Sequence, residues 1–128
     1  MKFKEIVKTK YGVLEGIESY TVYKEGNIYE CVLNKQNILN TKYGKLIPSY
    51  DDSDEGKRIG RSVEFYENGE IKVILLDSKT KINTSIGEFE VEKITFYPNG
   101  NIKRIFPFNK KISGFFNVDE EVKKRKYL

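Results

Sequence analysis

The chain has no histidine, no tryptophan and a single cysteine among its 128 residues. Without histidine it lacks the usual general base, the partner in Ser-His-Asp and Cys-His catalytic pairs, and the commonest zinc ligand. Because Cys31 is alone, no intramolecular disulfide can form. These absences favour a protein that is not an enzyme and that uses no cofactor or metal.

Long apolar runs are also missing. No stretch approaches the roughly 20 apolar residues that a membrane-spanning helix needs. The first residues, MKFKEIVKTKYG, do not contain the apolar segment of a secretory signal. We therefore expect a cytoplasmic protein, and the length suits one domain, residues 1–128, with its own core.

Aromatic and charged residues are plentiful. The chain has 9 Tyr and 8 Phe, a composition typical of strand-rich folds. It has 23 Lys and Arg against 19 Asp and Glu, a formal net charge of +4. A net charge of this size gives only a mild preference for anionic partners. A dedicated nucleic-acid binder has a much denser basic patch.

One hairpin pattern occurs twice in the sequence, as FYENGEIKVILL (65–76) and FYPNGNIKRIFPF (96–108). A weaker copy is VYKEGNIYECVL (22–33). Asn-Gly between two strand-like runs predicts a tight hairpin. Pro98 predicts a type I turn followed by Gly100 in the left-handed region, a three-residue loop. This register predicts the cross-strand pairs Tyr66–Glu70, Phe65–Ile71, Glu64–Lys72 and Val63–Val73.

A second landmark, the turn T-x-x-G, ends at Gly12, Gly44 and Gly87. Its period is about 31 or 32 residues once an acidic insertion, Ser49–Gly60, is set aside. Three units follow, at about 9–40, 41–83 and 84–116, and turn signals after Leu33 and Leu76 predict further short strands. The pattern predicts an all-β fold, a repetitive antiparallel hairpin meander forming an elongated sheet of about ten strands.

The last residues differ from the rest. NVDEEVKKRKYL predicts a short C-terminal helix at about 118–126. Asn117 is suited to its N-cap, and Glu120 completes a capping-box-like start. Acidic residues in the first turn and basic residues in the last complement the helix dipole.

The Y-x-x-G-x-[IL]-K hairpins, at Tyr23–Ile28, Tyr66–Lys72 and Tyr97–Lys103, resemble MORN-type repeats, most closely the bacterial MORN-like repeats of some antitoxin-type proteins. The resemblance covers three hairpins. It implies β-hairpins laid side by side, and a role as a scaffold, as a lipid- or protein-binding surface, or as the neutralising partner of a toxin. This chain has a longer period and lacks a regular second glycine after each hairpin.

Two features invite a chemical interpretation. Cys31 falls at an apolar strand position matching Ile74 and Ile105, so we expect a core residue and not a nucleophile. The acidic loop YDDSDEG, with Asp51, Asp52 and Asp54, has oxygen ligands for calcium but not the EF-hand spacing. We expect a solvated loop, and we keep its three Asp as candidate partner contacts.

The residue after the shared Ile of each hairpin varies most, and these residues, Tyr29, Lys72 and Lys103, form the predicted contact row. Arg104 extends it, with Phe106, Phe108, Phe115 and Phe116 nearby. We therefore expect a non-enzymatic module that binds another protein or acts as a scaffold. The alternative is peripheral binding of this Lys/Arg face to an anionic membrane or a nucleic acid. An enzyme using the loop carboxylates is the least favoured interpretation.

Overall fold

The computed structural model describes residues 6–50, 62–108 and 114–118. Across these ranges the fold is all-β, every strand pairing is antiparallel and no helix is present, which confirms the all-β, antiparallel part of the prediction. The strands are β1 (Ile6–Thr9), β2 (Gly12–Glu15), β3 (Ile17–Val22), β4 (Ile28–Leu33), β5 (Leu39–Thr41), β6 (Gly44–Leu46), β7 (Val63–Phe65), β8 (Ile71–Thr84), β9 (Gly87–Phe96), β10 (Ile102–Pro107) and β11 (Phe116–Asn117).

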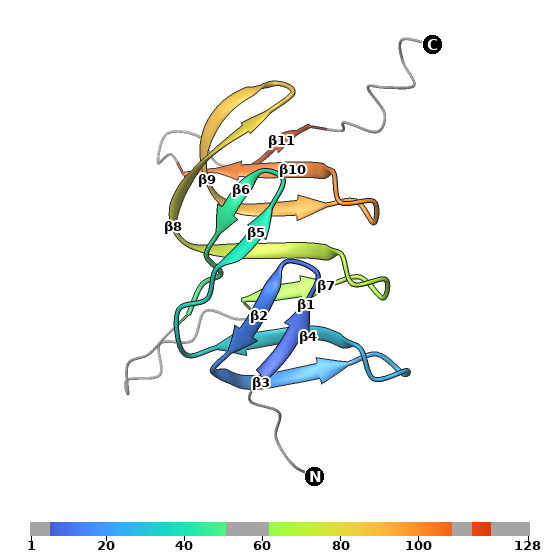
Figure 1. Ribbon diagram of the computed structural model, residues 1–128. Helices are drawn as coiled ribbons and strands as arrows, with labels where there is room; N and C mark the ends of the chain where they lie inside the picture. Colours follow the sequence, from blue (N-terminus) through green and yellow to red (C-terminus); the bar gives the residue numbers. More distant parts are fainter. Residues whose placement is uncertain (1–5, 51–61, 109–113, 119–128) are drawn as a thin grey trace.

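Seven strands form one sheet in the order β11-β10-β9-β8-β7-β4-β3. The pairs β1–β2 and β5–β6 cross in front of this sheet in Figure 1, and the far halves of β8 and β9 extend beyond it as a third pair. We call these three pairs the corner hairpins, because each ends in a T-x-x-G turn: corner 1 at 9–12, corner 2 at 41–44 and corner 3 at 84–87. We call β3–β4, β7–β8 and β9–β10 sheet hairpins 1, 2 and 3.

The core lies between the sheet and the corner hairpins. A row of side chains that are at most 1% exposed crosses the sheet through the paired positions Cys31, Val63, Ile74, Ile94 and Ile105. The corner hairpins add Leu14, Leu39, Leu46, Ile82 and Val91 to the same cluster. The sheet therefore buries one face, which we call the inner face, and leaves the other as the outer face. Cys31 is a core residue, as predicted.

All three sheet hairpins turn in the same way. In hairpin 2 the Tyr66 N–H donates to the Glu70 carbonyl at 2.7 Å, and the Gly69 N–H donates to the Tyr66 carbonyl at 3.0 Å. Hairpins 1 and 3 repeat both bonds. The turn glycines have φ of +101° at Gly26, +93° at Gly69 and +94° at Gly100. These observations confirm the predicted three-residue loop with a left-handed glycine.

The register beyond the turn departs from the prediction. Phe65 pairs with Ile71 as expected, but the next two pairs are Glu64–Val73 and Val63–Ile74. The predicted pairs Glu64–Lys72 and Val63–Val73 are therefore wrong. The cause is a register shift between Glu64 and Phe65, which leaves Lys72 without a cross-strand partner in the ladder.

This shift is a β-bulge, and it recurs in the other two sheet hairpins, where Tyr29 and Lys103 are skipped. A bulge lets two successive residues face the same side before the alternation resumes. Ile71 and Ile74 are accordingly both buried, at 2% and 0% exposure, with two half-buried residues between them. The imperfect alternation of apolar and polar residues in the sequence thus arises because the bulge shifts the alternation by one residue.

The corner turns owe their shape to threonine. In corner 2 the Thr41 hydroxyl donates to the Gly44 carbonyl at 2.9 Å and accepts from the Tyr43 N–H at 3.1 Å. Thr9 makes both bonds in corner 1, and Thr84 makes both in corner 3. Such side-chain bonds to the local backbone favour a tight turn over a continuing strand.

Side chains at the turns link one sheet hairpin to the next. The Tyr23 hydroxyl donates to the Phe65 carbonyl at 2.7 Å, and the Tyr66 hydroxyl donates to the Phe96 carbonyl at 2.6 Å. The Asn68 amide adds a bond to the Pro98 carbonyl at 2.9 Å. These contacts hold the turns of neighbouring hairpins in line.

Two segments differ from their expected course. Ser49, assigned to the insertion, belongs to the folded body, since it is 5% exposed and its N–H donates to the Leu75 carbonyl at 2.7 Å. Tyr50, also assigned to the insertion, packs against the core, and residues 51–60 lie outside the described residues. β8 continues through the turn that was predicted after Leu76, which is instead a register irregularity between Leu75 and Thr80.

The end of the described chain is a strand. Asn117, expected to cap a helix, is the last residue of β11 and its side chain accepts a bond from Arg104 Nε at 3.1 Å. Val118 follows, is 3% exposed, and its N–H donates to the Lys103 carbonyl at 2.9 Å. The remainder of the predicted helix, 119–126, lies outside the described residues.

Candidate functional site

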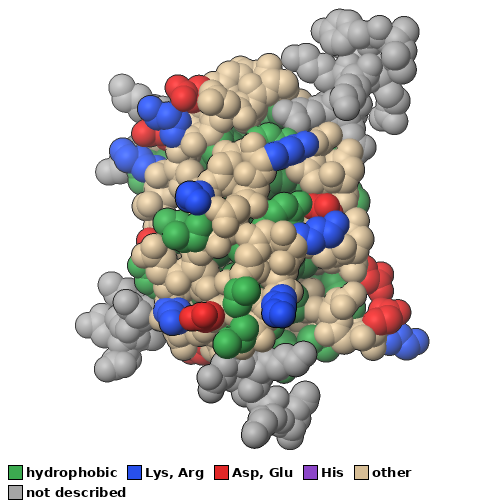
Figure 2. Space-filling view, viewed as in Figure 1, with side chains coloured by type: hydrophobic (Ala, Val, Ile, Leu, Met, Phe, Trp, Pro, Cys, Tyr) green, Lys and Arg blue, Asp and Glu red, His purple; other side chains and the backbone are tan. Residues whose placement is uncertain are grey.

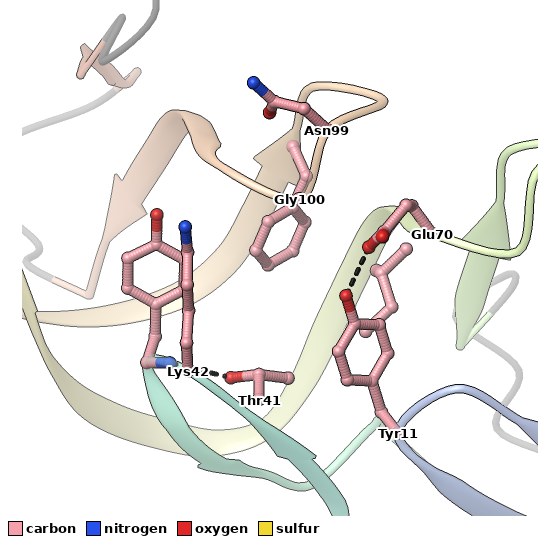
Figure 3. A pocket seen from close by; sticks show the side chains of 9 residues that line it. Tyr11, Thr41, Lys42, Glu70, Asn99 and Gly100 are labelled. Carbon is pink, nitrogen blue, oxygen red and sulfur yellow. Dashed lines mark hydrogen bonds between the residues drawn. The ribbon is translucent and has the colours of Figure 1, made fainter.

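The most site-like cluster of polar groups lies where corner 1 and corner 2 meet hairpins 2 and 3. It borders a pocket of about 240 Å³ with Ile71 and Phe96 in its lining. Figure 3 shows the Tyr11 hydroxyl directed at Glu70, to whose carboxylate it donates a hydrogen bond. Lys10 forms an ion pair with the same carboxylate at 2.9 Å.

The two acidic groups of this cluster are shifted in opposite directions. Burial raises the pKa of Tyr11 to about 12, helped by its hydrogen bond to Glu70 and by the charge of that carboxylate. Burial alone would also raise the pKa of Glu70. The hydrogen bonds from Tyr11 and Lys10 outweigh it, with the charges of Lys10 and Lys42, and hold that pKa below its ordinary value. At neutral pH the pair is thus a neutral phenol on a carboxylate, and neither group is poised for proton transfer.

A matching contact one unit further on explains the cluster. Tyr43 of corner 2 accepts the Ile102 N–H at 3.1 Å on its hydroxyl, and Lys42 donates to the Asn101 side chain. Asn101 follows the glycine of hairpin 3 as Glu70 follows the glycine of hairpin 2. Corners 1 and 2 therefore each dock on the sheet hairpin one unit ahead, and we call this contact a joint. Because the joint occurs twice, its polar groups serve the architecture.

Cys31 offers no nucleophile. Its side chain is 1% exposed, and burial, with a smaller contribution from the charge of Glu30, raises the pKa of its thiol to about 12. A thiol in that state is not ionised at neutral pH. Within the described ranges, no group of three His, Cys, Asp or Glu side chains is placed to hold a metal ion.

The contact row predicted from the sequence lies at the bulges. Tyr29, Lys72 and Lys103 occupy equivalent positions in hairpins 1, 2 and 3, and all three are half-buried. The neighbouring residues on the inner side, such as Ile71 and Ile102, are buried in the core. The row therefore lies outside the core, on the outer face.

Aromatic rings separate the cations of this row. Lys72 Nζ lies 6.0 Å from the centre of the Tyr29 ring and 5.7 Å from that of Tyr66. Lys103 Nζ lies 5.7 Å from the centre of the Tyr97 ring. Cation–π contacts of this kind are worth about 0.5–1 kcal/mol each at exposed sites. They hold the ammonium groups beside the rings, so the row is an ordered mixed surface of Tyr and Lys.

A second group of cations and rings continues the outer face toward β11. The Arg104 guanidinium lies 4.9 Å from the centre of the Phe115 ring, and Lys93 Nζ lies 4.7 Å from that of Phe106. The two rings are 5.4 Å apart. Phe115 is 47% exposed, so this group presents both apolar and positive surface to solvent. We call the Tyr–Lys row and this group together the outer strip.

The structure brings some of the predicted contact residues together, and others lie outside the residues it describes. Lys103 and Arg104 are consecutive and join the two parts of the outer strip, whereas Asp51, Asp52 and Asp54 lie outside the described residues. Sequence reasoning missed Tyr66, Tyr97 and Lys93 as members of this surface. The tyrosine of the Y-x-x-G pattern was the available signal, because it recurs beside every bulge position.

The opposite side of the molecule carries the corner hairpins. Figure 2 shows this side, where the basic side chains are scattered and several of them adjoin acidic ones. No protein-family model, curated protein or solved structure matches this chain. Among the residues placed by the structure, none belongs to a helix long and apolar enough to span a membrane.

Proposed function

We propose that this chain is a non-enzymatic protein-binding or scaffold module, an elongated and repetitive MORN-like hairpin sheet of the antitoxin-like kind, and that its outer strip contacts the partner. The observation that carries the proposal is the bulge. In three successive sheet hairpins it places Tyr29, Lys72 and Lys103 outside the core, next to tyrosine rings.

The chemistry of the outer strip suits a protein partner. Tyr, Phe and Arg are enriched at the energetic centres of protein interfaces, where a rigid ring buries much area at little entropic cost. The rings of the strip are already held by cations and by hydrogen bonds such as that from the Tyr66 hydroxyl to the Phe96 carbonyl. A preorganised surface loses less entropy on binding.

The absence of enzymatic activity is part of the proposal. The cluster of polar groups beside the pocket in Figure 3, Tyr11 with Lys10 and Glu70, is accounted for by the joints. Cys31 is buried with a raised pKa. These observations support a binding role and leave the outer strip as the surface to test.

One experiment addresses the outer strip directly. A photo-crosslinking amino acid placed at Lys103 should capture a partner protein in the native host, whereas the same group at Lys45, an exposed position on β6, should not. Lys72→Glu combined with Lys103→Glu should abolish the capture and leave the circular dichroism unchanged. Capture that is equal at both positions, or that survives the double substitution, would show that the outer strip is only a solvated face.

A second candidate function rests on the group around Arg104. Cations lying over exposed rings also suit stacked bases or an anionic lipid surface. Binding of the purified protein to single-stranded oligonucleotides or to phosphatidylserine vesicles should then fall steeply with salt. It should weaken with Arg104→Glu and Phe115→Ala. If neither ligand binds at low salt, this alternative is rejected.

A further inference from the structure

The two ends of the sheet expose the two halves of the joint that is closed twice inside the chain. Hairpin 1 is at one end, and β3 is the last strand of the sheet there. Asn27 follows its turn glycine and corresponds to Glu70 and Asn101. Among the described residues no corner docks on hairpin 1, because corner 1 docks on hairpin 2, and the Asn27 amide donates instead to the Glu67 carbonyl at 3.3 Å.

The gap beside hairpin 1 is larger than the equivalent gap beside hairpin 2. It has a volume of about 410 Å³, against about 240 Å³ for the pocket in Figure 3. Ile28 and Phe65 line it where Ile71 and Phe96 line the smaller pocket. Tyr11, supplied to the smaller pocket by the preceding corner, has no described equivalent in the larger one. The larger pocket is therefore an acceptor half of a joint.

Corner 3 is the matching donor half at the other end. Ile86 stands where Tyr11 and Tyr43 stand in corners 1 and 2, and its N–H makes the same bond to the corner threonine. Tyr11 and Tyr43 are half-buried in joints, whereas Ile86 is 40% exposed. The larger pocket also has polar lining residues such as Lys8, Asn27 and Asn68, and an uncharged side chain suits its apolar part, formed by Ile6, Val7, Ile28 and Phe65.

β11 occupies the place that a further hairpin would take. It pairs with β10 through Arg104–Asn117 and Ile105–Phe116, as β7 pairs with β4 through Glu30–Glu64 and Cys31–Val63. Val118 then fills the buried position that Phe65 fills in hairpin 2. Two residue pairs hold β11 in the ladder, and the bonds from the Val118 N–H and from Arg104 Nε to the Asn117 side chain add to them.

We propose that β11 is a releasable cap, and that the partner which fits the ends of this sheet is a second copy of the same chain. When β11 leaves, β3 of a second copy pairs with β10, and Ile86 enters the larger pocket of that copy. Val22, which is 50% exposed in β3, then takes the buried place of Val118. The contact is head-to-tail and does not close, so it generates open polymers.

The test uses full-length protein carrying Val118→Asp, with Asn117→Pro as a second variant that removes a β11 N–H. Sedimentation should show wild type as a monomer of 15.0 kDa, and both variants as species whose mass grows with concentration in multiples of that value. Folded but monomeric variants would overturn the proposal. Loss of the sheet in both would overturn it too, because a releasable cap must leave the sheet folded.

Two additions separate this contact from general aggregation. In the Val118→Asp background, Ile86→Glu should restore the monomer, whereas Ile38→Glu, at a similarly exposed position away from both ends, should not. Excess wild type should shorten the polymers, because it offers hairpin 1 but keeps its own cap. Polymers that are insensitive to Ile86→Glu and to added wild type would be ordinary edge aggregates, and the proposal would fail.

Discussion

The two faces of the sheet use the same residue types with different consequences. On the inner side, Tyr11 and Lys10 converge on Glu70, and the contact joins segments that lie 59 residues apart for the phenol and 60 for the ammonium. On the outer face, Lys72 lies between the rings of Tyr29 and Tyr66. The joint shapes the fold, whereas the outer strip adds surface to a sheet whose core is already complete.

The difference shows that residue type alone does not assign a role. A Tyr-Lys-Glu cluster beside a pocket would ordinarily suggest catalysis. Its recurrence at Tyr43 and Lys42 identifies it as a joint. The residues of the outer strip, in contrast, take no part in the joints. The comparison can be tested by substitutions on each side of the sheet.

The largest expected effect comes from neighbours on β9 that face opposite sides. Ile94 is fully buried in the core row, so Ile94→Ala should lower the free energy of unfolding by about 3 kcal/mol. Lys93→Ala removes only a contact with the Phe106 ring and should cost less than about 1 kcal/mol. Urea denaturation measures both. Similar losses would show that the outer face carries as much stability as the core.

Next in size is a pair of turn glycines that differ only in their surroundings. Gly26 and Gly100 have φ of +101° and +94°, so a Val at either meets left-handed strain of about 1–2 kcal/mol. A Cβ at Gly100 would also lie 3.2 Å from Glu70 Oε1, whereas nothing lies within 4 Å at Gly26. Gly100→Val should therefore destabilise by about 1 kcal/mol more than Gly26→Val. Equal losses of stability in thermal unfolding would mean that Glu70 can move away from the added side chain at no cost to the joint.

The joint should also give stability a pH dependence. The lowered pKa of Glu70 means that its stabilisation is present above the ordinary pKa of Glu, about 4.3, and is lost as pH falls through the lower folded value. Tyr11→Phe removes one of the bonds that lower this pKa and should cost about 1 kcal/mol at about pH 7. The difference from wild type should shrink toward about pH 3.

Tyr43→Phe is the matched control for this effect. The Tyr43 hydroxyl accepts a backbone N–H from Ile102, with no carboxylate in that bond. Its loss should cost a similar amount, with no change between the same two pH values. A pH-independent difference for Tyr11→Phe as well would show that the phenol contributes only a neutral hydrogen bond.

The turns were the most predictable part of the structure, because their causes are local. Glycine at Gly69 and Gly100 and threonine at Thr41 act within a few residues, through φ and through side-chain bonds to the backbone. The register was not predictable to the same degree. The only signal of the bulge was an interruption in the alternation of apolar and polar residues, with Ile74 and Leu75 both apolar. A sheet that is covered on both faces gives the same interruption.

Long-range contacts were beyond the sequence patterns. Nothing in the spacing of Tyr11 and Glu70 indicates that a corner docks one unit ahead. The side chain of Asn117 was expected to cap a helix, but it accepts a bond from Arg104 at the open edge of β10. In both cases tertiary contacts decide the outcome, and propensity or capping signals describe only the local segment.

The smallest expected effect is a gain in stability. Thr95 lies in the outer-face row between Val73 and Arg104, and its Oγ1 is buried with no hydrogen-bond partner among the described residues. Burying an unpaired hydroxyl costs free energy, so Thr95→Val should raise the free energy of unfolding by roughly 0.5–1 kcal/mol. Thr80→Val is the control, because the Thr80 hydroxyl donates to the Ser78 carbonyl at 2.9 Å. That substitution should not stabilise. If Thr95→Val were as unfavourable as Thr80→Val in urea denaturation, the hydroxyl would have a partner in solution, and the outer face at Thr95 would be wetter than its burial implies.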